Sequence, residues 1–366
     1  MSPFGRRANG ARRERLLASP RFAGGVFHNT NGARPGLKPG SAGALAGEYF
    51  RGGRRRVPVA PLPAESPLDV WRRPPETGLR TTWLGHSTLL LEIDGARVLT
   101  DPVWGERVSP TRMAGPKRFQ PVPVPVSGLP PLDAVVISHD HYDHLDAPTI
   151  RALALTDVPF ITSLGVGVHL EAWGVPPERI TELDWWEQVE VGALTITAAP
   201  SQHFSGRALG DRNRTLWSSF ALRGPRHGVF FSGDTGLTPE YGDIASRLGP
   251  FDLVMLEVGA FHPAWGHIHL GPDNALEALA LLGGGSFLPI HWGTFSLALH
   301  DWDEPAERLL EVAPTRGVHL VMPRLGDPVE PDRAVLTPWW REVTALEVSR
   351  PVDSEEPPVL LGDPVD

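Results

Sequence analysis

Residues 138–146, SHDHYDHLD, concentrate side chains that bind cations. Three histidines and three aspartates directly follow the apolar run 134–137, although such groups are costly to bury without compensation. His139 and His141 point to one side because side chains alternate along an extended segment. Neutral imidazoles combined with carboxylates are the ligands that Zn²⁺ and similar divalent cations select. A metal site therefore explains the stretch better than a solvated surface turn does.

The spacing H-x-H-x-D-H, which adds Asp143 and His144, resembles the signature of the metallo-β-lactamase superfamily. That resemblance implies three further ligands: a His after a middle strand, an Asp after a later strand and a His near the end. The candidates are His203 in AAPSQH, Asp234 in FFSGDTG and His291 in LPIHWG. Each follows a predicted strand, and the ordered set supports a metal site more strongly than any single member.

Five motifs resemble, more narrowly, the N-acylphosphatidylethanolamine phospholipase D branch of that superfamily. They are TWLGHS (82–87), LTDP (99–102), SHDHYDHLD (138–146), GDTG (233–236) and IHWGTF (290–295). The resemblance extends from about residue 80 to about residue 310. It implies an α/β fold, the αβ/βα sandwich, with two mixed β-sheets flanked by helices and a dinuclear zinc centre at the sheet edges.

The resemblance also implies two groups of metal ligands with one shared member. Mn²⁺ or iron stays open as an alternative to the two Zn²⁺ ions. One metal ion would be held by His139, His141 and His203. The other would be held by Asp143, His144 and His291, and Asp234 would bridge both.

Five residues would act in catalysis or orient the ligands. Asp143 and Asp234 would steer the attacking hydroxide and accept its proton. His269 would line the site and contact the substrate, or else be a surface histidine at the start of a helix. His86 and Asp101 would orient ligating imidazoles, since such rings need a partner on their other nitrogen. For His86, a core histidine bonded to the backbone is an equally open reading.

The sequence departs from this branch at two places. Glu257 stands where members usually carry an apolar residue or proline, and FHPAW (261–265) replaces a frequent Glu-Pro-Arg-Trp. The missing arginine weakens the expectation of phosphate recognition.

Periodicity predicts the elements that must position these residues. Helices are expected to begin near Asp146 and to span 272–282 and 304–312. Residues 118–131 alternate proline with valine, which predicts an extended loop outside any sheet. Strands are expected at 81–84, 87–93, 96–100, 133–137, 189–198, 216–222, 227–232, 253–257 and 286–290.

Composition and charge divide the chain into three expected regions. Residues 1–78 would form a basic, irregular extension on the body, 79–345 the catalytic domain and 346–366 an acidic, Pro-rich tail. Residues 1–80 hold 15 Lys and Arg against 5 Asp and Glu, although the whole chain has a net charge of −9. The extension is therefore expected to contact either anionic lipid or the acidic body, and no nucleic-acid partner is expected.

The composition also indicates the cellular compartment of the protein. With 41% hydrophobic residues the chain resembles soluble globular proteins, and the absence of cysteine excludes disulfides and thiolate ligands. We expect a cytoplasmic protein without a signal peptide or transmembrane segment, because glycines and a proline interrupt the uncharged stretch 278–300. Membrane association through the basic extension stays open.

The implied function is hydrolysis by a metal-bound hydroxide. The favoured substrate is a phosphodiester in lipids similar to N-acylphosphatidylethanolamine, cleaved as by a phospholipase D. The alternatives are a lactonase, esterase or β-lactamase-like amidase with the same metals, and a non-catalytic metal-binding scaffold or sensor. A lipid-facing enzyme should expose an apolar patch beside the metals, with Trp104, Phe119 and the Pro-Val loop as candidates. Without that patch, small soluble esters become the favoured substrates.

Overall fold

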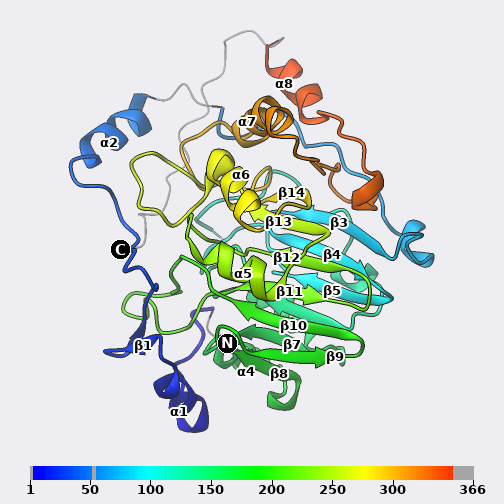
Figure 1. The fold of residues 1–366 in the computed structure, drawn as a ribbon. Coiled ribbons are helices and arrows are strands. Elements are labelled where there is room, and N and C mark those ends of the chain that lie inside the picture. Colours follow the sequence, from blue (N-terminus) through cyan, green and yellow to red (C-terminus); the bar gives the residue numbers. More distant parts are fainter. Residues whose placement is uncertain (1–2, 52–54, 112, 349–366) are drawn as a thin grey trace.

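The computed structural model describes residues 3–51, 55–111 and 113–348. Two β-sheets lie face to face, with helices on the outer sides of the pair (Figure 1). This layered arrangement confirms the predicted sandwich of two mixed sheets flanked by helices. Most of the expected acidic tail, from position 349 onward, lies outside the described residues.

The first sheet has seven strands in the order β15-β3-β4-β5-β6-β7-β8. It is mixed, because β15 to β5 pair antiparallel whereas β5 to β8 pair parallel. The strands are β3 (Leu79–Gly85), β4 (Thr88–Ile93), β5 (Ala96–Thr100), β6 (Ala134–Ile137), β7 (Phe160–Ser163), β8 (Ile180–Leu183) and β15 (Pro328–Val329).

The second sheet has six strands in the order β14-β13-β12-β11-β10-β9 and is also mixed. The strand expected at 189–198 is a hairpin, because Gly192 adopts φ 58° and turns the chain between β9 and β10. The strands are β9 (Gln188–Val191), β10 (Leu194–Ala199), β11 (Ser219–Arg223), β12 (Gly228–Phe231), β13 (Leu253–Glu257) and β14 (Ser286–Ile290).

The main core fills the space between the sheets. Leu89 and Leu91 of β4 belong to it together with Phe220 and Phe231, which share a face of the second sheet, and all four are fully buried. Leu90, between them, packs on the other face of its sheet under the helices that follow β6 and β7. Each such side chain contributes about 1.5–3 kcal/mol by leaving water, so both faces of β4 fix its register.

Helices cover the sheets and also occupy the N-terminal region, which the sequence predicted to be irregular. There the chain forms α1, α2 and a small ribbon of β1 (Phe22–Ala23) and β2 (Val26–Phe27). In Figure 1, α5 and α6 lie over the second sheet. The helices are α1 (Gly10–Ala18), α2 (Ala42–Arg51), α3 (Ala147–Leu153), α4 (Gly167–Ala172), α5 (Glu240–Leu248), α6 (Gly271–Leu281), α7 (Glu304–Val312) and α8 (Trp340–Val348).

Within the described residues, no helix combines the length and apolar character that a membrane crossing requires.

Candidate metal centre

The candidate ligands follow strand ends at one edge of the two sheets. β6, β10, β12 and β14 each end a few residues before one of them, and the turn between β3 and β4 carries His86. The backbone is unusual there, because His86, Asp101 and His291 have φ values of 54°, 32° and 65°. Such conformations are costly for residues other than glycine and cluster at functional sites.

The first group of nitrogen and oxygen atoms, the His203 cluster, comprises His139, His141, His203 and Asp234. His141 Nδ1 lies 2.8 Å from His139 Nε2 and 3.2 Å from His203 Nε2. Asp234 Oδ2 lies 3.6 Å from His203 Nε2 and 3.9 Å from His139 Nε2. Burial holds the pKa of both His139 and His203 well below the usual histidine value. These imidazoles are therefore neutral and able to bind a cation.

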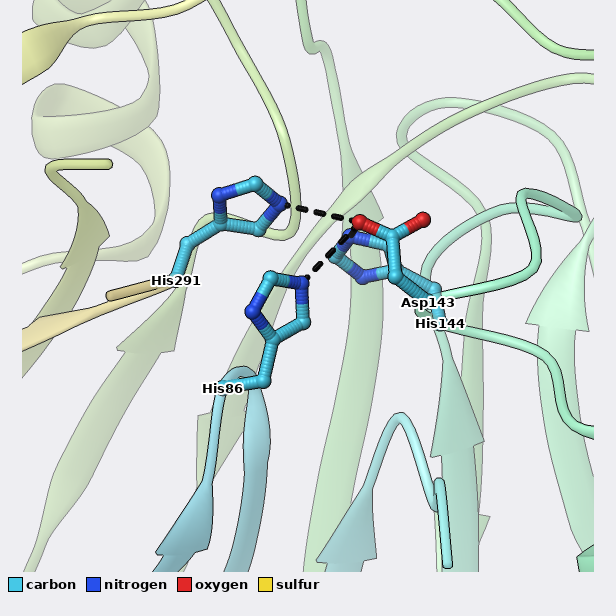
Figure 2. A group of neighbouring side chains, drawn as sticks. All are labelled: His86, Asp143, His144 and His291. Atoms are coloured by element: carbon cyan, nitrogen blue, oxygen red, sulfur yellow. Dashed lines mark hydrogen bonds and ion pairs between the residues drawn. The ribbon is translucent and has the colours of Figure 1, made fainter. Parts of the chain in front are cut away.

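The second group, the His291 cluster, comprises Asp143, His144, His291 and the other oxygen of Asp234. Figure 2 shows how His86, Asp143, His144 and His291 converge. Asp143 Oδ2 lies 3.3 Å from His291 Nε2 and 3.5 Å from His144 Nε2. Asp234 Oδ1 lies 3.1 Å from His144 Nε2 and 3.2 Å from His291 Nε2. Asp234 thus directs one carboxylate oxygen to each cluster, as a bridging ligand would.

Several of these atoms have unmet bonding capacity that a metal ion would satisfy. His144 Nε2, His291 Nε2 and Asp234 Oδ1 are buried, and none has an aligned hydrogen-bond partner among the described residues. An orphaned buried polar atom typically costs about 1–3 kcal/mol. Neighbouring imidazoles offset the burial of Asp143 and Asp234 and hold the pKa of each carboxyl well below its usual value. Two sets of mixed nitrogen and oxygen donors that share one carboxylate fit a pair of divalent cations.

Asp101 anchors ligands of both clusters from behind. Its Oδ2 lies 2.6 Å from His144 Nδ1 and accepts a 2.6 Å hydrogen bond from Ser138 Oγ. Ser138 Oγ in turn lies 2.9 Å from His139 Nδ1. The side chains of Asp101, His144 and Ser138 are all buried, so their contacts fix the ring orientations of two candidate ligands.

His86 contacts the His291 cluster directly. Its Nε2 lies 3.0 Å from Asp143 Oδ2, and its ring centre lies 3.9 Å from that of His291. Burial and the neighbouring His291 lower the pKa of His86 to about 3, so its ring is neutral. His86 can therefore orient the Asp143 carboxylate by donating an N–H.

His269 lies at the same edge and pairs with Glu257, which sequence reasoning noted as a departure but did not place in the site. His269 Nδ1 lies 2.7 Å from Glu257 Oε2. The His269 ring centre is 5.1 Å from that of His203 and 5.5 Å from that of His291. His269 therefore borders both clusters.

Asn29 is a second residue that the sequence did not point to. Its Oδ1 accepts a hydrogen bond from His203 N (3.1 Å), and its Nδ2 donates one to His203 O (2.9 Å). The N-terminal region thus fixes the backbone of a candidate ligand, although no local pattern around Asn29 signals it.

The motif residues that do not face the clusters brace the surrounding loops. Asp140 accepts hydrogen bonds from Gly206 N (2.8 Å) and Thr215 Oγ1 (2.9 Å). Arg207 lies over the Tyr142 ring at 4.0 Å and donates to Asp140 O (2.6 Å). The acidic and aromatic residues between the ligands therefore tie the metal loop to the loop after His203.

The apolar patch that the sequence suggested does not form from Trp104 and Phe119. The Trp104 ring packs against the core outside the first sheet and donates its Nε1–H to Val124 O (2.7 Å). Phe119 packs against the main core. Both rings are half-buried because the Pro-Val loop folds back onto the body.

Comparisons with known proteins agree with this architecture. The family model described as "Beta-lactamase superfamily domain" matches residues 96–292. An uncharacterized protein of Mycobacterium tuberculosis is 50% identical over 289 residues, which span 78% of this chain and 77% of the relative. The N-acyl-phosphatidylethanolamine-hydrolyzing phospholipase D 1 of Caenorhabditis elegans is 38% identical over 255 residues, spanning 66% of this chain and 71% of the relative.

Solved structures share the fold. The isothiocyanate hydrolase from Delia radicum gut bacteria aligns with a TM-score of 0.55 and 24% identity, over 69% of this chain and 98% of the other. The chain therefore belongs to the metallo-β-lactamase superfamily of metal-dependent hydrolases and resembles its N-acylphosphatidylethanolamine phospholipase D branch.

Proposed function

We propose that this hydrolase cleaves phosphodiesters of the phospholipase D type in lipids similar to N-acylphosphatidylethanolamine. The proposal rests on the shared carboxylate of Asp234 between two donor clusters, together with the 38% identity to the nematode phospholipase D. Hydrolysis of this phosphodiester would release the N-acylated head group as an alcohol and leave phosphatidic acid.

The proposed ligands are the His203 cluster for one metal ion and the His291 cluster for the other, with zinc as the proposed metal. A pair of such ions, when bound, would supply hydroxide at neutral pH and stabilise the negative charge that develops on phosphorus-bound oxygens. Asp234 contacts both clusters and Asp143 contacts the His291 cluster, so these carboxylates can orient a water molecule and accept its proton. A small hollow adjoins His291 and is lined by Arg56, Trp292, Phe295, Leu297, His300 and Trp302.

A second candidate function is hydrolysis of small soluble esters or lactones. The inward packing of Trp104 and Phe119 favours it, since these rings do not supply the apolar surface expected beside a lipid site.

Metal-loaded protein distinguishes the two candidates. We expect turnover of N-acylphosphatidylethanolamine in mixed micelles and of bis(p-nitrophenyl) phosphate, with loss of both activities in Asp234→Asn. Hydrolysis of lactones or p-nitrophenyl esters, without any phosphodiester turnover, would instead establish the second function. Element analysis of the purified protein identifies zinc, manganese or iron.

We further propose a cytoplasmic protein that contacts anionic membranes through exposed arginines of its N-terminal region. Arg12 is already engaged with Glu171 (2.7 Å) and Glu182 (2.6 Å) on the body, whereas Arg6, Arg7 and Arg13 are exposed. Sedimentation with anionic but not zwitterionic vesicles, reduced by charge reversal of the three exposed arginines, is the expected result.

A further inference from the structure

Glu257, the last residue of β13, is a fully buried carboxylate beside the two clusters. Its Oε1 accepts hydrogen bonds from Thr235 N (2.9 Å) and Leu270 N (3.2 Å). Its Oε2 lies 2.7 Å from His269 Nδ1. A carboxylate is costly to bury unless it is paired and hydrogen-bonded. The contacts of Glu257 therefore indicate what the buried acid does.

The arrangement leaves only one nitrogen of His269 available to a substrate. Because Nδ1 faces a carboxylate oxygen that can only accept, the ring carries its proton on Nδ1 when it is neutral. His269 Nε2 forms no hydrogen bond with any residue that the structure describes. The His269 side chain is 12% exposed, whereas His203 and His291 are each 1% exposed. His269 thus stands closer to solvent than the ligands on either side of it.

We propose that Glu257 is a positioning residue that holds His269 with its proton on Nδ1 and its Nε2 turned toward the bound substrate. The inference rests on the proposed function, because the substrate is the partner of Nε2. It adds to that function a polar contact supplied by this chain's own Glu257–His269 pair. A neutral Nε2 accepts a hydrogen bond from a substrate hydroxyl or amide, and a protonated Nε2 donates one to an anionic oxygen.

Glu257 also lies close to a candidate ligand. Its Oε2 is 4.0 Å from His291 Nδ1, a buried nitrogen without a hydrogen-bond partner among the described residues. A carboxylate behind a ligating imidazole strengthens the ligand and fixes its orientation. Measurements on Glu257 variants must therefore separate an effect on His269 from an effect on metal content.

Glu257→Gln is the informative variant, because it preserves the shape of the side chain and replaces the acceptor that faces His269 with a donor. The glutamine oxygen can still accept from Thr235 N and Leu270 N, which leaves the amide NH₂ facing His269 Nδ1. Two donors cannot pair, so the neutral His269 ring should move its proton to Nε2. Glu182→Gln is a matched control, because Glu182 Oε1 likewise accepts from two backbone groups, Gly165 N (2.8 Å) and Gly167 N (2.9 Å).

The first measurement is ¹⁵N NMR of histidine-labelled, zinc-loaded protein at a pH at which the His269 ring is neutral. The His269→Gln variant assigns the signal. We expect the Nδ1–H tautomer in the unaltered protein and the Nε2–H tautomer in Glu257→Gln. An Nε2–H tautomer in the unaltered protein would overturn the proposal without any variant, and this readout does not depend on the substrate.

The second measurement is a double-mutant cycle with bis(p-nitrophenyl) phosphate. We expect Glu257→Gln to lower kcat by about 10–100-fold with both metal ions retained, and Glu182→Gln to leave it unchanged. In the His269→Gln variant, adding Glu257→Gln should not lower kcat further, since Glu257 acts through His269. An equal loss on both backgrounds, or a loss that follows metal content, refutes the positioning role. If the unaltered protein hydrolyses no phosphodiester, the proposed function fails while the tautomer measurement still tests the pair.

Discussion

The N-terminal region should secure the His203 cluster through a single amide, Asn29. Its Oδ1 accepts from His203 N (3.1 Å) and Trp217 Nε1 (3.1 Å), and its Nδ2 donates to His203 O (2.9 Å) and Ala33 O (2.9 Å). In Asn29→Ala, Trp217 Nε1 keeps its bond to Ser201 O (3.0 Å). The N–H and C=O of His203 have no other hydrogen-bond partner among the described residues, so both become orphaned in a buried place.

The expected loss of folding free energy follows from the unpaired N–H and C=O groups of His203. Each orphaned buried backbone group costs about 1–3 kcal/mol, and water entering the space left by the amide reduces the sum, so we expect a loss of about 2–4 kcal/mol. The melting temperature should then fall by roughly 4–8 °C at about 2 °C per kcal/mol for a chain of this size. Because His203 would be held less firmly, the metal content should fall from two ions toward one.

The assay is thermal unfolding and element analysis of Asn29→Ala beside Asn31→Ala. Asn31 lies two residues along and hydrogen-bonds the Gln202 side chain without touching His203, so its variant controls for a general loosening of the N-terminal region. Equal stability and equal metal content in the two variants would show that Asn29 does not support the site.

Three further outcomes follow from the contacts at the site. Asp234→Asn should lose both metal ions, whereas His291→Ala should lose about one, as element analysis after gel filtration can measure; equal contents would contradict a bridging Asp234. Chelation should abolish hydrolysis and lower the melting temperature, because the donor atoms of both clusters lose their cations, and titration with Zn²⁺, Mn²⁺ or Fe²⁺ should restore both. Arg207→Met should cost about 2–4 kcal/mol in urea unfolding, because the backbone oxygens of Asp140 and Leu145 lose a buried charged donor; an unchanged midpoint would refute this role for Arg207.

Local patterns predicted the elements that carry the ligands. β13 and β14 have the predicted bounds, 253–257 and 286–290, because their apolar residues 253–256 and 287–290 are buried on both faces. Helix α3 begins where predicted, since Asp146 accepts a hydrogen bond from Thr149 N (3.2 Å) at its N-terminus.

Elements without a strong local pattern were missed. Helix α1 buries only Leu16, so its sequence has no apolar stripe that would distinguish it from an irregular segment. The helix is instead stabilised on the body by the ion pairs of Arg12 with Glu171 and Glu182, which lie far along the chain.

The candidate ligands were predicted from the H-x-H-x-D-H spacing and from the family resemblance, and each follows a predicted strand. The packing of the two sheets decided how the ligands meet, and in particular that the two oxygens of Asp234 face different clusters. Tertiary structure alone also brought Asn29 to His203 and His269 to Glu257. An amide or a buried acid signals no partner by itself, since its hydrogen bonds are satisfied by whichever segment the fold places beside it.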